Sequence, residues 1–185
     1  MMMINRDIFY REIRPLFGTL STGQVTGINV KLDYYQDNQE LMSIPQFAYV
    51  LGTIFHETDE KMQPVREKGK GIGKRYGKMV NGKAYYGMGD VQLTWIDNYQ
   101  KAGVMVHKNL VDNPELMLVP SVSVEVAMKG MAVGLFTGKK LSDFITEDKI
   151  DFVNARRIIN GMDRAVLIAG YAGKFLGALQ KAKTD

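Results

Sequence analysis

The sequence contains no cysteine and only two histidines among its 185 residues. These absences exclude disulfide bonds and thiolate metal sites, and two histidines are too few for most zinc sites. No apolar run approaches the roughly 18 residues that a membrane-spanning helix requires. The first residues also lack the apolar stretch and the small-residue cleavage site of a secretory signal. We therefore expect no metal site, no stable membrane insertion, and synthesis in the cytoplasm without a signal peptide.

The composition that remains is that of an ordinary globular protein. Hydrophobic residues make up 45% of the chain and charged residues 24%, and the length allows a sizeable core. We expect a single domain spanning residues 1–185. The net charge of +4 suits an anionic partner such as nucleic acid, a membrane surface or an acidic cell-wall polymer. The positive net charge alone does not indicate which of these partners the protein binds.

Hydrophobic periodicity predicts a mainly helical fold. Helices are expected over residues 5–17, 22–37, 44–58, from 91 onward, from 114, and over 120–136, 151–159 and 165–179. The helix over 120–136 is apolar nearly all round, as expected of a buried central helix, and Gly138 should end it. The dipeptide Asn81-Gly82 between two short β-like runs predicts one small β-hairpin over residues 78–86.

Glu57 stands in the last turn of the helix predicted over residues 44–58, at the rim of its apolar face. Partial burial and the negative end of the helix dipole both raise a carboxyl pKa, so Glu57 can hold a proton near neutral pH. A general acid requires such a group. Because a glutamate at a helix end is usually a solvated surface residue, this interpretation depends on the residues that follow.

Glu67 follows ten positions later, beside Arg66 and Lys70, whose positive charges favour its ionised form. Two carboxyl groups in opposed environments suit cleavage of a glycosidic bond. One protonates the leaving oxygen, while the other activates a water molecule or attacks the sugar. Asp59 and Glu60 are nearer in sequence but are expected to be solvated. Whether Glu67 or another carboxylate is the base stays open.

These glutamates and a longer motif resemble glycoside hydrolase family 19. The matching segments are His56-Glu57-Thr58, Tyr85-Tyr86-Gly87-x-Gly89-x-x-Gln92-Leu93-Thr94-Trp95-x-x-Asn98-Tyr99 and Arg156-Arg157-Ile158-Ile159-Asn160-Gly161. The family includes class I-type chitinases and the chitinase-like endolysins of bacteriophages. Because the chain lacks the extra loops and cysteines of plant chitinases, the compact phage lysozymes are the closer likeness.

The resemblance implies a lysozyme-like fold, mainly α with a small β element, in which two helical lobes flank a cleft. It also implies an inverting mechanism, with Glu57 as the general acid, Glu67 as the general base and Thr94 as the hydroxyl that helps to hold the attacking water. The residues assigned to substrate binding are His56, Tyr86, Gln92, Asn98 and Asn160.

Several of these residues have structural alternatives. Gln92 and Asn98 can instead brace the loop backbone, and His56 can be a hydrogen-bonded structural residue. Trp95 and Tyr99 are expected in the core rather than as platforms for sugar rings.

The chain departs from the family pattern at Gly87-Met88-Gly89-Asp90, where an arginine usually stands between the glycines. Met88 cannot supply a guanidinium to the glutamates, and Asp90 adds a negative charge that would raise the pKa of Glu57. We expect weakened activity or a raised pH optimum unless Arg66, Lys74 or Arg75 compensates.

The expected function is hydrolysis of peptidoglycan β-1,4 glycan bonds by an endolysin (muramidase) that needs no cofactor. A monomer would be made in the bacterial cytoplasm and would reach glycan strands in the cell wall or periplasm through a holin-like export route. The alternatives are a chitinase acting on poly-N-acetylglucosamine and a catalytically weakened glycan-binding protein. Nucleic-acid binding rests only on the charge of residues 69–78 and is not expected.

Overall fold

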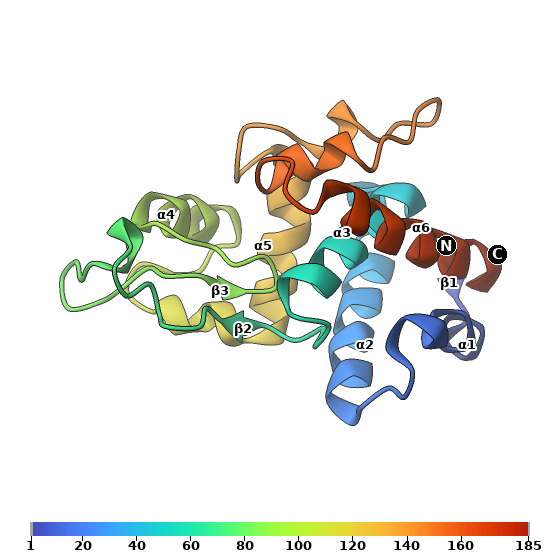
Figure 1. Cartoon of the computed structure of the whole chain (residues 1–185), viewed down its shortest axis with the longest axis horizontal. Coiled ribbons are helices and arrows are strands. Elements are labelled where there is room, and N and C mark those ends of the chain that lie inside the picture. The colour runs from blue at the N-terminus through green and yellow to red at the C-terminus, as the bar shows by residue number, and fades with distance from the viewer. Residues whose placement is uncertain (1, 185) are drawn as a thin grey trace.

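Six α-helices form most of the computed structural model, which describes residues 2–184 (Figure 1). They are α1 (Arg6–Phe17), α2 (Thr22–Asp37), α3 (Ile44–Glu57), α4 (Ile96–Met105), α5 (Pro120–Val133) and α6 (Ala165–Ala182). Short 3-10 helices lie in the connections: η1 (Gln39–Leu41), η2 (Arg75–Gly77), η3 (Pro114–Leu118), η4 (Leu141–Asp143) and η5 (Asn154–Ile158). No helix within residues 2–184 is long and apolar enough to cross a membrane.

The strands are only two residues long and form two small antiparallel sheets. β1 (Met3–Ile4) pairs with β4 (Lys183–Thr184), which joins the two ends of the described chain. β2 (Val65–Arg66) pairs with β3 (Met88–Gly89), with Val65 opposite Gly89 and Arg66 opposite Met88.

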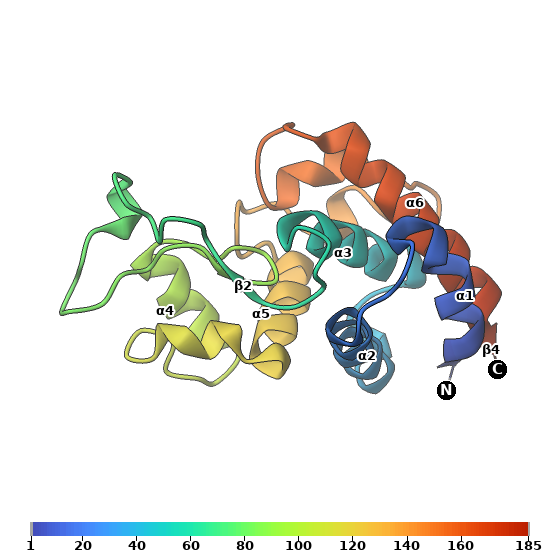
Figure 2. The ribbon, with the colours of Figure 1, turned by 60° about the horizontal axis from the view of Figure 1, so that its bottom comes forward.

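Two hydrophobic cores divide the molecule into two lobes. The larger core gathers α1, α2, α3 and α6 around residues such as Phe9, Phe47 and Phe175. The smaller core gathers the segment 85–118, with Tyr99 of α4 at its centre. α5 contributes to both cores, and in both orientations it stands between the two groups of elements (Figures 1 and 2). The predicted fold class, a mainly α, lysozyme-like arrangement of two lobes, is confirmed.

α3 is the best-anchored helix of the larger lobe. Ser43 and Gln46 form a capping box at its first turn, as the sequence indicated for Ser43. Its middle packs closely on α6, because a Cβ atom at Gly52 would lie 2.7 Å from the backbone nitrogen of Ala172. Only glycine permits this approach of two helix backbones. The contact fixes the position of Glu57, the last residue of α3.

The small sheet is not where the sequence placed the hairpin. Asn81-Gly82 does form a two-residue turn, with φ values of 50° and 75°, but only one bridge, Val80 to Lys83, follows it. Tyr85 and Tyr86 turn into the smaller core instead of extending the hairpin. Burial of these two aromatic rings therefore outweighs the pairing that the turn would have nucleated.

Two predicted helix boundaries are also wrong. The helix expected from residue 91 begins only at Ile96, because Gln92 and Trp95 have positive φ values of 54° and 71°, which a right-handed helix does not allow. α5 ends at Gly134, which adopts the left-handed conformation, and not at Gly138.

A buried ion pair joins the two lobes. Lys31 Nζ of α2 lies 2.9 Å from Asp90 Oδ1 in the loop after β3, and both side chains are fully buried. The backbone N–H of Asp90 donates to Ser123 Oγ of α5 at 2.7 Å. Burial raises the pKa of Asp90, while the Lys31 ammonium acts in the opposite direction.

This arrangement corrects the expectation drawn from Met88 and Asp90. The Asp90 carboxylate is turned inward and paired with Lys31, so it is not a free negative charge in the loop after β3. Met88 is 1% exposed and fills the smaller core. The two departures from the family pattern are therefore packing features of the lobe junction.

Removal of one partner of this pair should destabilise the fold. We expect Lys31→Met to lower the free energy of unfolding by about 3–5 kcal/mol, because it leaves a buried carboxylate without its counter-charge. The double variant Lys31→Met/Asp90→Leu should recover most of that loss. Urea denaturation of both variants and the wild type measures the effect.

Lys129→Met is the matched control, since Lys129 pairs with Glu125 on the partly exposed face of α5. Its expected cost is below about 1 kcal/mol. If Lys31→Met unfolded at the same urea concentration as Lys129→Met, the pair would not support the junction.

Candidate active site

Glu57 is held by an ion pair that the sequence analysis did not identify. Its side chain is 17% exposed, and Oε1 accepts a hydrogen bond from Nη1 of Arg156 at 2.6 Å. Arg156 belongs to η5, is 3% exposed, and donates through Nε to the backbone carbonyl of Asp163 at 3.0 Å. The guanidinium is therefore fixed from two directions beside the carboxylate.

Arg156 supplies the guanidinium that Met88 cannot. It lies 99 positions from Glu57 in sequence, which is why local spacing did not reveal the contact. The signal in the sequence is the motif Arg156-Arg157-Ile158-Ile159-Asn160-Gly161, from which only Asn160 is assigned a role by the resemblance. This correction replaces the expected compensation by Arg66, Lys74 or Arg75.

The three basic residues proposed for that compensation lie elsewhere. Arg66 Nη1 donates to Glu115 Oε1 at 2.6 Å and to Tyr86 Oη at 3.3 Å. Lys74 and Arg75 are exposed in the loop that contains η2. None of the three forms an ion pair with Glu57 within residues 2–184.

Glu67 directly follows β2 and is held by uncharged donors. Its Oε1 accepts from the Tyr76 hydroxyl at 2.8 Å, and its Oε2 accepts from the Gly87 N–H at 3.1 Å. Its own N–H donates to the Gly87 carbonyl at 2.7 Å. Both oxygens of the Glu67 carboxyl group therefore accept hydrogen bonds, and its orientation is fixed.

Tyr76 reaches Glu67 because the intervening loop folds back on itself. Gly71 and Gly77 meet so closely that a Cβ atom at Gly77 would lie 2.0 Å from the carbonyl oxygen of Gly71. The hydrogen bond to Glu67 raises the pKa of the Tyr76 phenol, so the hydroxyl remains a donor well above neutral pH.

Gln92 and Asn98 brace the backbone, which is the structural alternative considered for them. Gln92 Nε2 donates to the carbonyls of Val65 at 3.0 Å and Gly89 at 3.3 Å, and so joins β2 to β3. Asn98 Nδ2 donates to the carbonyl of Thr94 at 3.0 Å. Thr94 is half-buried in the loop between them.

The remaining residues assigned to substrate binding are distributed over both lobes. Tyr86 is 7% exposed, and its hydroxyl accepts from Arg66. Asn160 is exposed just after η5, where its Oδ1 accepts from the Gly161 N–H at 2.8 Å. His56 is half-buried in the last turn of α3, and within residues 2–184 its side chain has no hydrogen-bond partner.

Of the two aromatic residues expected in the core, one is buried and the other is exposed. Tyr99 is fully buried, as predicted, and its hydroxyl donates to the Tyr86 carbonyl at 2.9 Å. Trp95 is 44% exposed, so its prediction is wrong. Its backbone, with a positive φ, turns the ring onto the edge of Tyr76, at a centroid distance of 5.6 Å. The exposed Trp95 ring thus lies against Tyr76, the half-buried residue whose hydroxyl holds Glu67.

The site contains carboxylates but no constellation for a metal ion. Across residues 2–184, no three histidine, aspartate or glutamate side chains are arranged to ligate one. One carboxylate is paired with a fixed guanidinium, and the other is held by a phenol and a backbone N–H. The two carboxylates therefore differ in their partners, one beside a charged donor and the other beside uncharged donors.

Comparisons with known proteins identify the family and the fold. The family model for glycoside hydrolase family 19, chitinase class I, matches residues 40–133, slightly more than half of the chain. The matched range includes both glutamates. No curated protein sequence matches the chain significantly.

Solved structures of chitinases share the fold. Chitinase C from Streptomyces griseus superposes with a TM-score of 0.68 at 21% identity, covering 97% of this chain and 93% of that one. A class IV family 19 chitinase from Zea mays gives a TM-score of 0.57 at 17% identity, with 88% and 82% covered. A bacterial family 19 chitinase gives 0.54 at 18% identity, with 95% and 94% covered. From the family match and the shared fold, the chain belongs to glycoside hydrolase family 19 and is a chitinase-like glycoside hydrolase.

Proposed function

We propose that this glycoside hydrolase is an endolysin-type lysozyme that cleaves the β-1,4 glycan bonds of peptidoglycan by an inverting mechanism. The observation that carries the choice of substrate is the charge beside Glu67. Five exposed cations lie in the loop that follows it: Lys68, Lys70, Lys74, Arg75 and Lys78. Peptidoglycan carries carboxylates on its peptide stems, whereas chitin is uncharged, so this loop attracts peptidoglycan selectively.

In the proposed mechanism Glu57 is the general acid. It protonates the glycosidic oxygen as the bond to the leaving sugar breaks, and becomes an anion. The Arg156 guanidinium, already 2.6 Å from Oε1, stabilises that anion and keeps the carboxyl group in one orientation. Arg156 is thus a positioning residue for the acid.

Glu67 is the proposed general base. Held by Tyr76 and Gly87, it accepts a proton from a water molecule that attacks the anomeric carbon from the opposite face, so the configuration inverts. The Thr94 hydroxyl is assigned to orienting this water. The residues assigned to direct contact with the glycan are His56, Tyr86 and Asn160. Gln92 and Asn98 are also assigned to glycan binding, but they act through the backbone that they brace.

The proposal also includes the oligomeric state of the enzyme and its route to the cell wall. The enzyme acts as a monomer without a cofactor, is made in the bacterial cytoplasm, and reaches the cell wall or periplasm through a holin-like export route.

A chitinase is the second candidate, and one observation favours it. The exposed Trp95 ring beside Tyr76 offers an apolar face near Glu67, on which an uncharged N-acetylglucosamine ring can stack. The two candidates are separated by incubating the protein with purified sacculi and with a chitin oligomer of matched concentration. Mass spectrometry identifies the new reducing-end sugar. Muramic acid at that end supports the lysozyme, and cleavage of chitin alone contradicts it.

Loss of the acid should abolish turnover. We expect Glu57→Gln to lower the rate of sacculus hydrolysis by about two to four orders of magnitude, because an amide cannot protonate the leaving oxygen. Reducing ends released over time measure the rate, and circular dichroism checks that the fold is intact. Asp59→Asn is the matched control, since Asp59 lies on the exposed turn just after α3. Equal rates for Glu57→Gln and wild type would show that another residue is the acid.

A change in Arg156 should act on the chemical step. We expect Arg156→Lys to lower kcat about tenfold with little change in KM, because an ammonium cannot bind both Glu57 and the Asp163 carbonyl in the same geometry. The pH profile of kcat should shift as well. Arg157→Lys, at the exposed neighbouring position, is the control and should keep both parameters. A change in KM alone would contradict the positioning role.

A further inference from the structure

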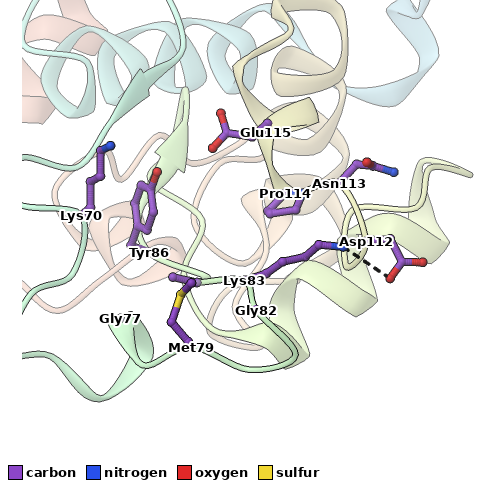
Figure 3. A pocket seen from close by; sticks show the side chains of 11 residues that line it. Lys70, Gly77, Met79, Gly82, Lys83, Tyr86, Asp112, Asn113, Pro114 and Glu115 are labelled. Carbon is purple, nitrogen blue, oxygen red and sulfur yellow. Dashed lines mark ion pairs between the residues drawn. The ribbon is translucent and has the colours of Figure 1, made fainter.

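A cavity of about 510 Å³ lies in the smaller lobe, between the segment 70–86 and η3 (Figure 3). This volume is within the range of about 300–1,000 Å³ that is typical of ligand sites. Its apolar walls include Met79, Ala84 and Pro114, together with one side of Tyr86. The proposed acid and base, Glu57 and Glu67, do not line the cavity, whereas Tyr86, which is assigned to the glycan, does.

Charges of both signs face the cavity. Lys70 and Lys83 come from the segment that follows Glu67, and Asp112 and Glu115 come from the region of η3 (Figure 3). Lys83 Nζ lies 3.9 Å from Asp112 Oδ1, which is a loose pair that a ligand can replace. Lys70 has no ion-pair partner within residues 2–184 and remains available for an anionic group.

The cavity is connected to the residues that hold Glu67. Tyr86 lines it, and the next residue, Gly87, donates its N–H to Glu67 Oε2. Glu115, on the opposite wall, pairs with Arg66, which directly precedes Glu67. A polymer bound along Glu67 can therefore place a side branch in the cavity.

The residues that line the cavity indicate which kind of side branch it can bind. An uncharged sugar would form no ion pair with Lys70 or with the loosely paired Lys83 and Asp112, and a simple anion such as phosphate would lie near the Asp112 carboxylate. A short peptide with free carboxylates, a free amine and small apolar side chains satisfies all of these groups. Resting on the proposed function, we infer that this cavity binds the peptide stem of peptidoglycan, with a stem carboxylate at Lys70 and a stem amine at Asp112, whose pair with Lys83 is loose.

The test compares two glycan substrates that differ only in the stem. Sacculi are solubilised, and half of the strands are freed of their peptides by an amidase. We expect wild type to show a KM about fivefold lower for peptide-bearing strands, the effect of one partly exposed charge pair. Lys70→Met should remove that difference. Lys101→Met is the control, because Lys101 is an exposed cation of α4 in the same lobe and outside the cavity, and it should keep the difference.

The outcomes are distinct. Equal KM values of wild type for the two substrates would overturn the inference. The same KM change in Lys70→Met and Lys101→Met would also overturn it, because it would indicate general attraction by positive charge. A rise in KM for both substrates in Lys70→Met alone would also overturn it, because the lysine would then bind glycan.

A second measurement separates this inference from the proposed function. The amidase-released stem peptide is titrated into wild type and Lys70→Met, and NMR shifts of residues around the cavity are followed. Saturable shifts in wild type that weaken in Lys70→Met support the site even if no strand is cleaved, in which case only the proposed hydrolysis fails. If strands are cleaved but the peptide causes no shifts, the cavity is not a stem site.

Discussion

The close contact of α3 with α6 is the constraint on which the candidate site depends. At Gly52 the two helix backbones approach so closely that any side chain would collide with Ala172. This contact fixes the axis of α3 and therefore the place where the helix ends, at Glu57. The segment that enters α6 carries Arg156, so the same packing brings the guanidinium to the carboxylate. A single helix–helix contact thus positions both members of the ion pair.

The second carboxylate is held by a different kind of interaction. Glu67 depends on hydrogen bonds from Tyr76 and Gly87, within a loop closed by the meeting of Gly71 and Gly77. It belongs to the smaller lobe, whereas Glu57 belongs to the larger one. Each lobe therefore contributes one carboxylate. Glu57 has a charged partner, Arg156, and Glu67 has uncharged partners, Tyr76 and the Gly87 N–H. This difference follows from how each lobe packs and not from a single local motif.

The junction between the lobes explains the unusual residues of the long motif. Lys31 of α2 compensates Asp90, whose backbone N–H is bound by Ser123 of α5, so this loop is tied to both lobes. Met88 occupies the core volume beside it. A buried pair of this kind is costly to desolvate, but it can specify how two parts of a protein meet. In this protein it fixes the orientation of the smaller lobe against α2.

The sequence by itself determined the features that depend on local periodicity and local chemistry. Amphipathic spacing and caps such as Ser43 placed the helices of the larger lobe, and the spacing of Glu57, Glu67 and the long motif indicated the family. Only the tertiary structure decided that Arg156 pairs with Glu57 and that Asp90 is buried on Lys31, because these contacts join residues far apart in sequence. Their partners are selected by packing, which a pattern of neighbouring residues does not encode.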